Sequence, residues 1–392
     1  MTLPNGWKNV RLSELGTFSK GSGIKRDEAN SGSIPAIRYG EIYTAHNDYI
    51  KQFQSFISEK VAKEATLLKN GDLLFSCSGE TKEDIGKCVA FVSNERAYAG
   101  GDIIILSPTV PCDSKYIGFL CNSSFVNKQR YSFAQGDSIV HISSESIGKI
   151  EIPFPPLNEQ KKIAATLSVW DSAIEKMEKL IEAKESQKKF LITKSIKFSD
   201  DKKASGLTEI KLSDVFDEVC EKNHPDEDVL TIIQGVGTVL RENSGREIIY
   251  DKNSLSNYKY VKKGDFIIHL RSFEGGLEVA NQDGIVSPAY IILRPKIKVS
   301  TIYLYALFHT NEFINRTIAP AVEGARDGRS IKYDALKNQT IILPNISEQQ
   351  SVAELFLEAD NEISLLKQQF ENYKMQKQGL MQKLLTGQWR VK

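Results

Sequence analysis

Arginines next to glycines are the side chains in this sequence best suited to bind a nucleic-acid base. The segment 324–332 reads Gly-Ala-Arg-Asp-Gly-Arg-Ser-Ile-Lys and contains Arg326, Arg329 and Lys332. A guanidinium group can donate two parallel hydrogen bonds to O6 and N7 of guanine, the commonest base-specific contact in DNA complexes. We therefore expect this segment to contact DNA, although a solvated surface turn would have the same composition.

A second segment offers polar groups in place of cations. Gln135, Ser138 and His141 lie within 135–141. The side-chain amide of glutamine can bind adenine through N6 and N7, and a serine hydroxyl can bind several bases. We expect this segment to take part in base reading in the first half of the chain.

A third segment, 20–26, places Lys20, Lys25 and Arg26 around two glycines. Glycine lets a backbone approach a ligand closely, and cations that contact phosphate position a protein on DNA without reading its sequence. We expect a mobile phosphate-binding loop, or else a solvated turn. Further candidates, each of which would also suit a surface ion pair or hydrogen bond, are Arg38, Tyr39, Thr81, Lys82, Gln234, Arg241, Arg246 and Arg271.

Motifs for catalysis are missing from the sequence. A nucleotide-dependent motor needs a glycine-rich loop ending in Gly-Lys-Ser/Thr, and the nearest segments are Gly86-Lys87-Cys88 and Gly148-Lys149-Ile150. The Asn/Asp-Pro-Pro-aromatic signature of amino-methyltransferases is approached only by 154–157, which reads Phe-Pro-Pro-Leu. The five histidines and five cysteines show neither His-x-x-x-His nor Cys-x-x-Cys spacing. We predict no catalytic or metal site and no disulfide framework.

Length and charge favour a folded protein with at least two domains. The chain has 392 residues, of which 41% are hydrophobic, and domains usually hold about 100 to 200 residues. The net charge of +1 gives no general attraction to phosphate, which counts against a nonspecific nucleic-acid binder. Because we find no signal-peptide pattern and no segment of transmembrane length, we expect a cytoplasmic protein.

The sequence contains two copies of one unit. Segment 10–15 is matched by 210–215, after a polar linker. From Ile142 onward, matching residues lie 189 positions apart without insertion or deletion, as Asp171 and Asp360 do. A segment that tolerates no length change is typical of a packed helix, because one inserted residue turns its apolar face by about 100°.

Both copies end in a heptad pattern that predicts a long helix. An isolated pattern of this kind also suits a core helix or a homodimerising coiled coil, but two copies in one chain can pair with each other, and we expect them to do so antiparallel. Asn158 should cap the first helix, and Ser347 with Gln350 should form a capping box at the second. The expected seam positions are Ile163, Leu167, Trp170, Ile174, Met177, Ile181, Lys184, Lys188, Leu191 and Ser195 in the first copy, and Val352, Phe356, Ala359, Ile363, Leu366, Phe370, Tyr373, Lys377, Leu380 and Leu384 in the second.

The helix ends resemble those of specificity subunits of type I restriction-modification enzymes. The resemblance rests on 155–164, Pro-Pro-Leu-Asn-Glu-Gln-Lys-Lys-Ile-Ala, and on 380–391, Leu-Met-Gln-Lys-Leu-Leu-Thr-Gly-Gln-Trp-Arg-Val, and the order of domains and helices extends it to the full length. The second helix departs from the family pattern, because Leu-Pro-Asn at 343–345 replaces the double proline. The resemblance implies two target recognition domains, and two helices that act as a ruler and hold two adenine-methylating modification subunits. It transfers no base contacts, because recognition domains diverge within the family.

We therefore predict an α+β protein in which two similar globular α/β recognition domains are joined by two long helices that form an antiparallel coiled coil. The predicted function is non-catalytic recognition of a bipartite DNA target, with double-stranded DNA, two modification subunits and restriction subunits as partners. The alternative is a coiled-coil scaffold that joins proteins without reading DNA. We expect no cofactor on this chain, and S-adenosylmethionine, ATP and Mg²⁺ on the partner subunits. The expected boundaries are 1–156 for the first domain, 157–198 for the first helix, 199–206 for a linker, 207–345 for the second domain, 346–386 for the second helix and 387–392 for a tail.

Adding one heptad to both helices, after Ile174 and after Ile363, should lengthen the spacer between the two DNA half-sites. Seven residues keep the seam in phase and extend each helix by about 10 Å. At about 3.4 Å per base pair, the preferred spacer should grow by about three base pairs. Methylation mapping of the assembled enzyme measures this gap. An unchanged gap, or altered half-sites, would mean that the helices do not set the spacing.

Overall fold

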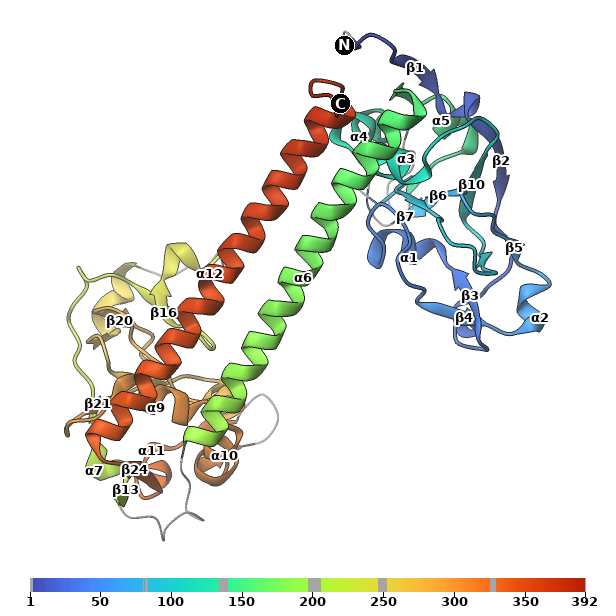
Figure 1. Cartoon of the computed structure of the whole chain (residues 1–392). Helices are drawn as coiled ribbons and strands as arrows, with labels where there is room; N and C mark the ends of the chain where they lie inside the picture. The colour runs from blue at the N-terminus through green and yellow to red at the C-terminus, as the bar shows by residue number, and fades with distance from the viewer. Residues whose placement is uncertain are drawn as a thin grey trace. The chain divides into compact units, whose positions relative to one another are not determined.

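The computed structural model describes residues 3–79, 81, 84–133, 140–196, 206–245, 252–324 and 329–391. The chain divides into two compact units (Figure 1). Unit 1 comprises Met1–Glu178 and Gln368–Lys392, and unit 2 comprises Lys179–Lys367. Both long helices contribute to both units, so each unit consists of one globular part and one stretch of each helix.

The globular part of unit 1 is built on two four-stranded sheets. One has the order β2-β10-β6-β8 and is antiparallel, and the other has the order β4-β3-β9-β5 and includes the parallel pair β3 and β9. The pairs β1-β12 and β7-β11 complete the strands described here. The strands are β1 Lys8–Arg11, β2 Gly16–Lys20, β3 Ile34–Ile37, β4 Ser55–Ile57, β5 Thr66–Leu67, β6 Leu73–Ser76, β7 Ser78–Gly79, β8 Cys88–Ala90, β9 Tyr98–Ala99, β10 Ile103–Pro108, β11 Val140–His141 and β12 Glu151–Phe154.

Helices cover the first of these sheets and complete its core. Tyr116 and Phe119 of α3 are fully buried and pack with Phe75 of β6. Burial of one large apolar side chain contributes about 1.5 to 3 kcal/mol, so this cluster is a main source of the stability of unit 1. The helices are η1 Leu12–Glu14, η2 Arg26–Glu28, α1 Tyr39–Thr44, α2 Glu59–Ala62, α3 Ser114–Cys121, α4 Ser124–Ser132 and α5 Ser144–Gly148.

Unit 2 repeats the first of these sheets and has the two-stranded pairs β15-β16, β17-β20 and β22-β23 among its described strands. Its four-stranded sheet has the order β14-β21-β18-β19, and β13-β24 corresponds to β1-β12 of unit 1. Phe216, Phe266 and Phe308 form its aromatic core. The strands are β13 Leu207–Lys211, β14 Phe216–Val219, β15 Leu230–Ile233, β16 Gly237–Leu240, β17 Lys259–Val261, β18 Phe266–Ile268, β19 Glu278–Val279, β20 Gly284–Val286, β21 Ile291–Pro295, β22 Val322–Glu323, β23 Ser330–Ile331 and β24 Thr340–Pro344. The helices are α7 Leu212–Val215, η4 Arg241–Ser244, η5 Lys252–Asn257, α8 Ser272–Gly275, α9 Thr301–Phe308, α10 Asn311–Phe313, η6 Ile314–Ile318, η7 Ala319–Ala321 and α11 Tyr333–Leu336.

Two long helices, α6 (Leu157–Ser195) and α12 (Ile346–Leu385), follow the globular parts. In unit 1, Trp170 packs edge-on against Tyr373 with ring centroids 5.8 Å apart. In unit 2, Lys184 binds Glu362 at 2.7 Å. Trp170 lies in the first half of α6 and Tyr373 in the second half of α12. Lys184 lies in the second half of α6 and Glu362 in the first half of α12, so the two helices run antiparallel.

The predicted seam is confirmed, because its positions are buried or half-buried whereas most residues between them are exposed. The predicted fold class, two similar α/β parts with two long paired helices, is also confirmed. Despite the length of α6 and α12, no helix among the described residues is long and apolar enough to cross a membrane.

Both predicted helix caps are wrong. The first helix begins at Leu157, one residue before the proposed cap Asn158, directly after the double proline. The second begins at Ile346, and Asn345 accepts a hydrogen bond from Glu348 N at 3.0 Å. Asn345 therefore fills the capping role that we assigned to Ser347, because the short side chain of asparagine reaches the free N–H groups of the first turn.

A buried glutamine fastens the start of each long helix to its globular part. The side chain of Gln160 accepts a hydrogen bond from Asp113 N at 2.9 Å and donates one to Pro155 O at 2.8 Å. Its counterpart Gln349, 189 residues later, accepts a hydrogen bond from Ser300 N at 3.0 Å and donates one to Pro344 O at 2.8 Å. Asp113 and Ser300 are the N-caps of α3 and α9, so the glutamines join equivalent elements in the two units.

The seam of each unit also contains a lysine paired with an aspartate. In unit 1, Lys377 binds Asp171 at 2.5 Å and Asp48 at 3.3 Å. In unit 2, Lys188 binds Asp360, and both residues lie 189 positions from their counterparts. The lysine and aspartate side chains are 13% and 6% exposed in unit 1, but 27% and 55% exposed in unit 2. Burial alone lowers the pKa of Lys377, but Asp48 and Asp171 raise it above its ordinary value and keep the lysine charged.

The two ends of the described chain pack against the start of α6, within unit 1. Glu159 accepts hydrogen bonds from Trp7 Nε1 at 3.1 Å and from Arg390 at 2.8 and 2.7 Å. Gly387 has a φ of 73° and lies against Pro4, where a Cβ would be 2.6 Å from that ring. A glycine is therefore required at the end of α12 for this contact.

Replacing Lys377 with methionine should destabilise the protein by about 3 to 5 kcal/mol, because Asp48 and Asp171 would remain buried without the lysine that pairs with both of them. The matched substitution Lys188→Met should cost about 1 kcal/mol or less, since Asp360 is half exposed to solvent. Urea denaturation of both variants measures the free energy of unfolding. Equal losses in the two variants would show that burial does not distinguish these pairs.

Candidate nucleic-acid interface

A groove in unit 1 brings together two of the predicted DNA-binding segments. The groove has a volume of about 630 Å³. Lys25 and Arg26 line one part of it, and Arg38 and Tyr39 line another. These segments are separate in the sequence and meet because the loop after β2 lies beside α1, whose N-cap is Arg38. The other lining residues are Gly23, Ile24, Gly40, Glu41, Tyr43, Thr44, Gly101 and Asp102.

Close packing accounts for the glycines of the loop 21–25. A Cβ on Gly21 would lie 2.0 Å from Gly100 O, so a larger residue does not fit there. Gly23 O accepts a hydrogen bond from Gly101 N at 2.9 Å, and Ser22 Oγ donates to Glu64 O at 2.8 Å. The loop is therefore tied to neighbouring segments on both sides, and its mobility stays a prediction.

Backbone strain is located at this loop. Ile24 has a φ of 60°, which is unusual for a β-branched residue, and its side chain is buried in a small core with Ala36 and Tyr98. Burial of the side chain holds the residue in this conformation. The strained turn directs the chain into η2, where Glu28 accepts a hydrogen bond from Lys25 N at 2.8 Å.

The groove is polar and mostly cationic, with Lys25, Arg26 and Arg38 against the carboxylates of Glu41 and Asp102. Burial raises the pKa of Glu41, although Arg38 and a hydrogen bond from the hydroxyl of Ser55 oppose this shift. The groove therefore suits an anionic ligand such as a phosphate backbone.

Other candidates of unit 1 lie near the strand pair β7-β11. Ser78 Oγ is 3.1 Å from His141 Nδ1, and Thr81 Oγ1 donates to Asp84 at 2.7 Å. Cys77, next to β7, is 3.7 Å from Asp102, which also lines the groove. This cluster is therefore adjacent to the groove, while the exposed side chain of Lys20 is not among the groove-lining residues.

In unit 2, three predicted residues converge on the short helix α8. Arg271 is its N-cap, and Gln234 lies so close to Gly275 that a Cβ there would be 1.3 Å from the amide nitrogen. Arg329 stacks over the Phe273 ring at 4.4 Å and lies 3.8 Å from Glu274. Gln234 and the two arginines are exposed, so they form an accessible polar and cationic surface around α8.

Our sequence reasoning missed Glu278, which supports this surface from below. Its fully buried carboxylate accepts hydrogen bonds from Gly235 N at 2.7 Å and from Tyr305 Oη at 3.2 Å, and faces His309 Nε2 at 3.0 Å. Burial alone raises the pKa of Glu278, but the hydrogen bonds from His309, Gly235 and Tyr305 bring it below its ordinary value. The ionised carboxylate therefore holds the turn that carries Gln234. An isolated glutamate in a strand gives no sequence signal for this role.

Two further candidates of unit 2 lie elsewhere. Arg241 is stacked on Tyr258 at 5.7 Å, and Lys332 is the N-cap of α11 with an exposed side chain. Five predicted residues, Lys82, Gln135, Ser138, Arg246 and Arg326, lie outside the described residues. The assignment of all seventeen side chains to DNA binding stays a prediction.

The β7-β11 cluster of unit 1 and the α8 surface of unit 2 occupy equivalent places in the fold, whereas the groove of unit 1 lies beside α1. In unit 1 the cluster at β7 follows strand β6, and in unit 2 helix α8 follows β18, the corresponding strand of the four-stranded sheet. His141 of β11 and Ser330 of β23, next to Arg329, lie 189 positions apart.

Among the described residues, no group of three or more His, Cys, Asp and Glu side chains could hold a metal ion.

Known proteins match both halves of this chain. The family model described as "Type I restriction modification DNA specificity domain" matches residues 4–185 and 204–372. The MjaVIII type I restriction enzyme specificity subunit of Methanocaldococcus jannaschii is 25% identical over 434 residues, which cover 100% of this chain and 95% of that protein.

Solved structures are similar over the whole chain. The type I restriction-modification S subunit of M. genitalium has a TM-score of 0.56 and 15% identity, with 98% of both chains covered. A chain from a structural study of complex assembly and conformational transition of the type I R-M system has a TM-score of 0.66 and 18% identity, with 99% of this chain and 100% of that chain covered. The duplicated fold, the paired helices and the match of both halves lead to one conclusion: this chain belongs to the type I restriction-modification DNA specificity family and carries one copy of the family's domain in each half.

Proposed function

We propose that each unit of this specificity subunit reads one half-site of a bipartite double-stranded DNA target. The observation that carries the proposal is the gathering of cationic and amide side chains, from segments far apart in the sequence, within each of two diverged units. Similar folds with different contact residues would bind DNA in related poses and read different bases. The target would then be two unlike sequences.

Within unit 1, the proposed division of labour follows from the chemistry of the side chains. Lys25 and Arg26, on the exposed loop, would contact phosphates and position the domain. Arg38 and Tyr39 begin a helix at the groove, and a guanidinium group held there can bind a guanine edge. In unit 2, Arg271, Arg329 and Gln234 would read bases from around α8, the glutamine by its amide.

The proposal also includes the partners. Two modification subunits and the restriction subunits would carry S-adenosylmethionine, ATP and Mg²⁺, and this chain would hold them in the cytoplasm on DNA. The long helices support this, because α6 exposes Val169 and Phe190, and α12 exposes Leu365 and Met375, which are apolar side chains that a partner could cover. We retain the domain boundaries predicted above. The alternative function, a coiled-coil scaffold that joins proteins without reading DNA, is not supported by the family model or by the similar proteins.

Replacing Arg38 with alanine should weaken specific DNA binding by about 1 to 3 kcal/mol and relax one half-site, because a bidentate base contact would be lost. Arg271→Ala should relax the other half-site. A matched control is Arg96→Ala, since Arg96 is paired with Glu59 at 2.8 Å and does not line the groove. Selection from random duplexes by the assembled complex measures both half-sites. Loss of specificity in the Arg96 variant alone, or in none of the three, would contradict the assignment.

The isolated chain should turn over neither S-adenosylmethionine nor ATP, because its sequence lacks the motifs that bind and activate them. Addition of the modification and restriction subunits should supply both activities at the selected DNA sequence. Methyl transfer and ATP hydrolysis are measured with the chain alone and with the partners present. Turnover by the chain alone, at a rate that scales with its concentration, would overturn the non-catalytic assignment.

A further inference from the structure

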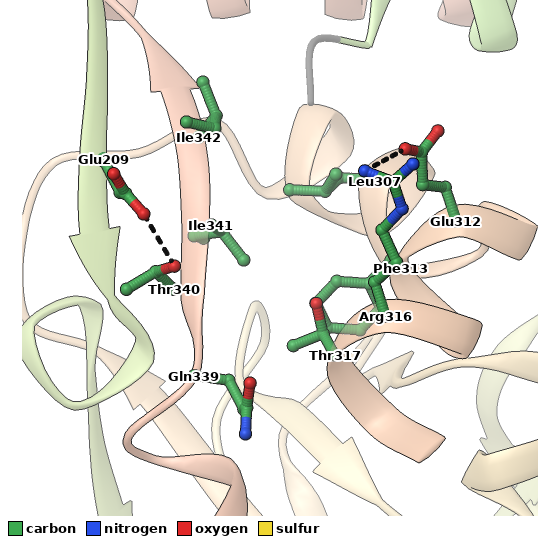
Figure 2. Close-up of a pocket in the computed structure, with 10 residues that line it drawn as sticks. All are labelled: Glu209, Leu307, Glu312, Phe313, Arg316, Thr317, Gln339, Thr340, Ile341 and Ile342. Atoms are coloured by element: carbon green, nitrogen blue, oxygen red, sulfur yellow. Dashed lines mark hydrogen bonds and ion pairs between the residues drawn. The ribbon is translucent and has the colours of Figure 1, made fainter. Parts of the chain in front are cut away.

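Strand β24 of unit 2 has a pocket along one edge (Figure 2). The pocket has a volume of about 180 Å³. Figure 2 shows Thr340, Ile341 and Ile342 of β24 on one side, and Leu307 and Phe313 across the pocket. The remaining lining residues are Glu209, Glu312, Arg316, Thr317 and Gln339.

On the edge of β24 that faces the pocket, some backbone N–H and C=O groups take no part in the pairing with β13. Leu212 N donates to Gln339 O at 3.0 Å, so the next pair, Lys211 and Thr340, is a non-hydrogen-bonded pair of the antiparallel ladder. The N–H and C=O of Thr340 therefore point away from β13, toward the pocket. By the same alternation, so do those of Ile342.

Unit 1 contains a second copy of this edge, and there it is closed by a side-chain amide. Gln129 of α4 donates from Nε2 to Glu151 O at 2.9 Å and accepts at Oε1 from Glu151 N at 2.9 Å. The carboxamide thus occupies the place that the peptide group of a neighbouring strand would take. Glu151 and Thr340 lie 189 positions apart, and both pair with equivalent residues of the partner strand.

Unit 2 has lost both features that close the edge in unit 1. Arg316 stands where unit 1 has Gln129, because each lies six residues after the helix N-cap, Thr310 or Ser123. Arg316 pairs with Glu312 at 3.0 Å, one turn back on its own helix, and gives β24 no amide. Pro153 of unit 1, which has no N–H, is replaced by Ile342, which has one.

We propose that the edge of β24 binds an extended peptide segment of a partner subunit, which adds to the β13-β24 pair as a third strand. The occupant is identified by the internal copy: the group seated on the equivalent edge in unit 1 is a carboxamide with its donor and acceptor side by side, the same pattern that an extended peptide presents. The buried residues Leu307, Phe313 and Ile341 make the pocket suitable for one apolar side chain of that segment.

This inference rests on the proposed function, because the partner is one of the subunits that the specificity chain would assemble. Exposed strand edges attract other strands, and proteins usually block them. In unit 1 the edge of β12 is blocked by Gln129, whereas in unit 2 no described strand or side-chain amide bonds the equivalent edge of β24. The second half therefore has a strand edge at which a partner can bind, and the first half lacks it. Partner subunits bound to the two halves can then make different contacts.

Hydrogen exchange of single amides tests the inference on the full chain and on the complex with modification and restriction subunits. In the free chain the N–H of Thr340 should exchange at least tenfold faster than that of Glu151, which Gln129 protects. In the assembled complex the N–H of Thr340 should become protected. Assembly without this protection would overturn the inference and leave the proposed function standing, whereas failure to assemble would count against the proposed function itself.

Two variants separate edge pairing from a change of charge. Arg316→Gln should close the edge as Gln129 does and protect the N–H of Thr340 in the free chain. It should also lower the affinity for the partner subunit by tenfold or more. Arg316→Ala removes the same charge but supplies no amide, and should leave the edge open and the affinity within about threefold of the original. Equal weakening by both variants would assign the effect to charge and overturn the inference, as would protection of Thr340 in the free chain that rises with protein concentration, since the occupant would then be a second copy of this chain.

Discussion

One buried glutamine in each unit fixes how a globular part meets its long helix. The amides of Gln160 and Gln349 bind the main chain on both sides, at the N-cap of α3 or α9 and at the proline before the helix. A side-chain amide has one donor group and one acceptor group, so in a single orientation it bonds both the N–H at the N-cap and the carbonyl of the proline. Loss of either bond would leave a buried polar group unpaired. Substitution of the glutamine would therefore disturb both the long helix and the globular part.

The helix pair adds a second constraint that differs between the units. Lys377 ties the seam to the globular part through Asp48, whereas Lys188 ties helix to helix alone. A buried charge tolerates little displacement from its partners, and a solvated one tolerates much. Unit 1 therefore adds a buried ion pair to the apolar contacts between its globular part and the helices, whereas in unit 2 apolar contacts such as those of Ile196 and Phe356 accompany the Gln349 bonds.

Duplication lets the two units keep one framework and change their surfaces. The four-stranded sheets have matching order, and the Ser78–His141 pair of unit 1 and the α8 surface of unit 2 lie after the equivalent strands β6 and β18. Different side chains occupy that place, a serine-histidine pair in unit 1 and arginines around α8 in unit 2. The same divergence closed the edge of β12 with Gln129 and left that of β24 beside a pocket. Framework residues must satisfy buried hydrogen bonds and packing, whereas exposed ones are free to vary.

The sequence by itself determined the two halves, the long helices and their seam, because heptad spacing and a constant offset of 189 are local or repeated patterns that need no tertiary information. It also pointed to Arg38, Arg271 and Arg329 as candidates, since their chemistry is intrinsic. Tertiary structure decided which of them meet: the groove joins 25–26 with 38–39, and α8 collects Gln234 and Arg329 from segments about a hundred residues apart. It also decided the helix caps and the role of Glu278, because hydrogen bonds to backbone groups depend on where the chain turns and on what burial leaves unpaired, and neither is encoded by the spacing of residue types.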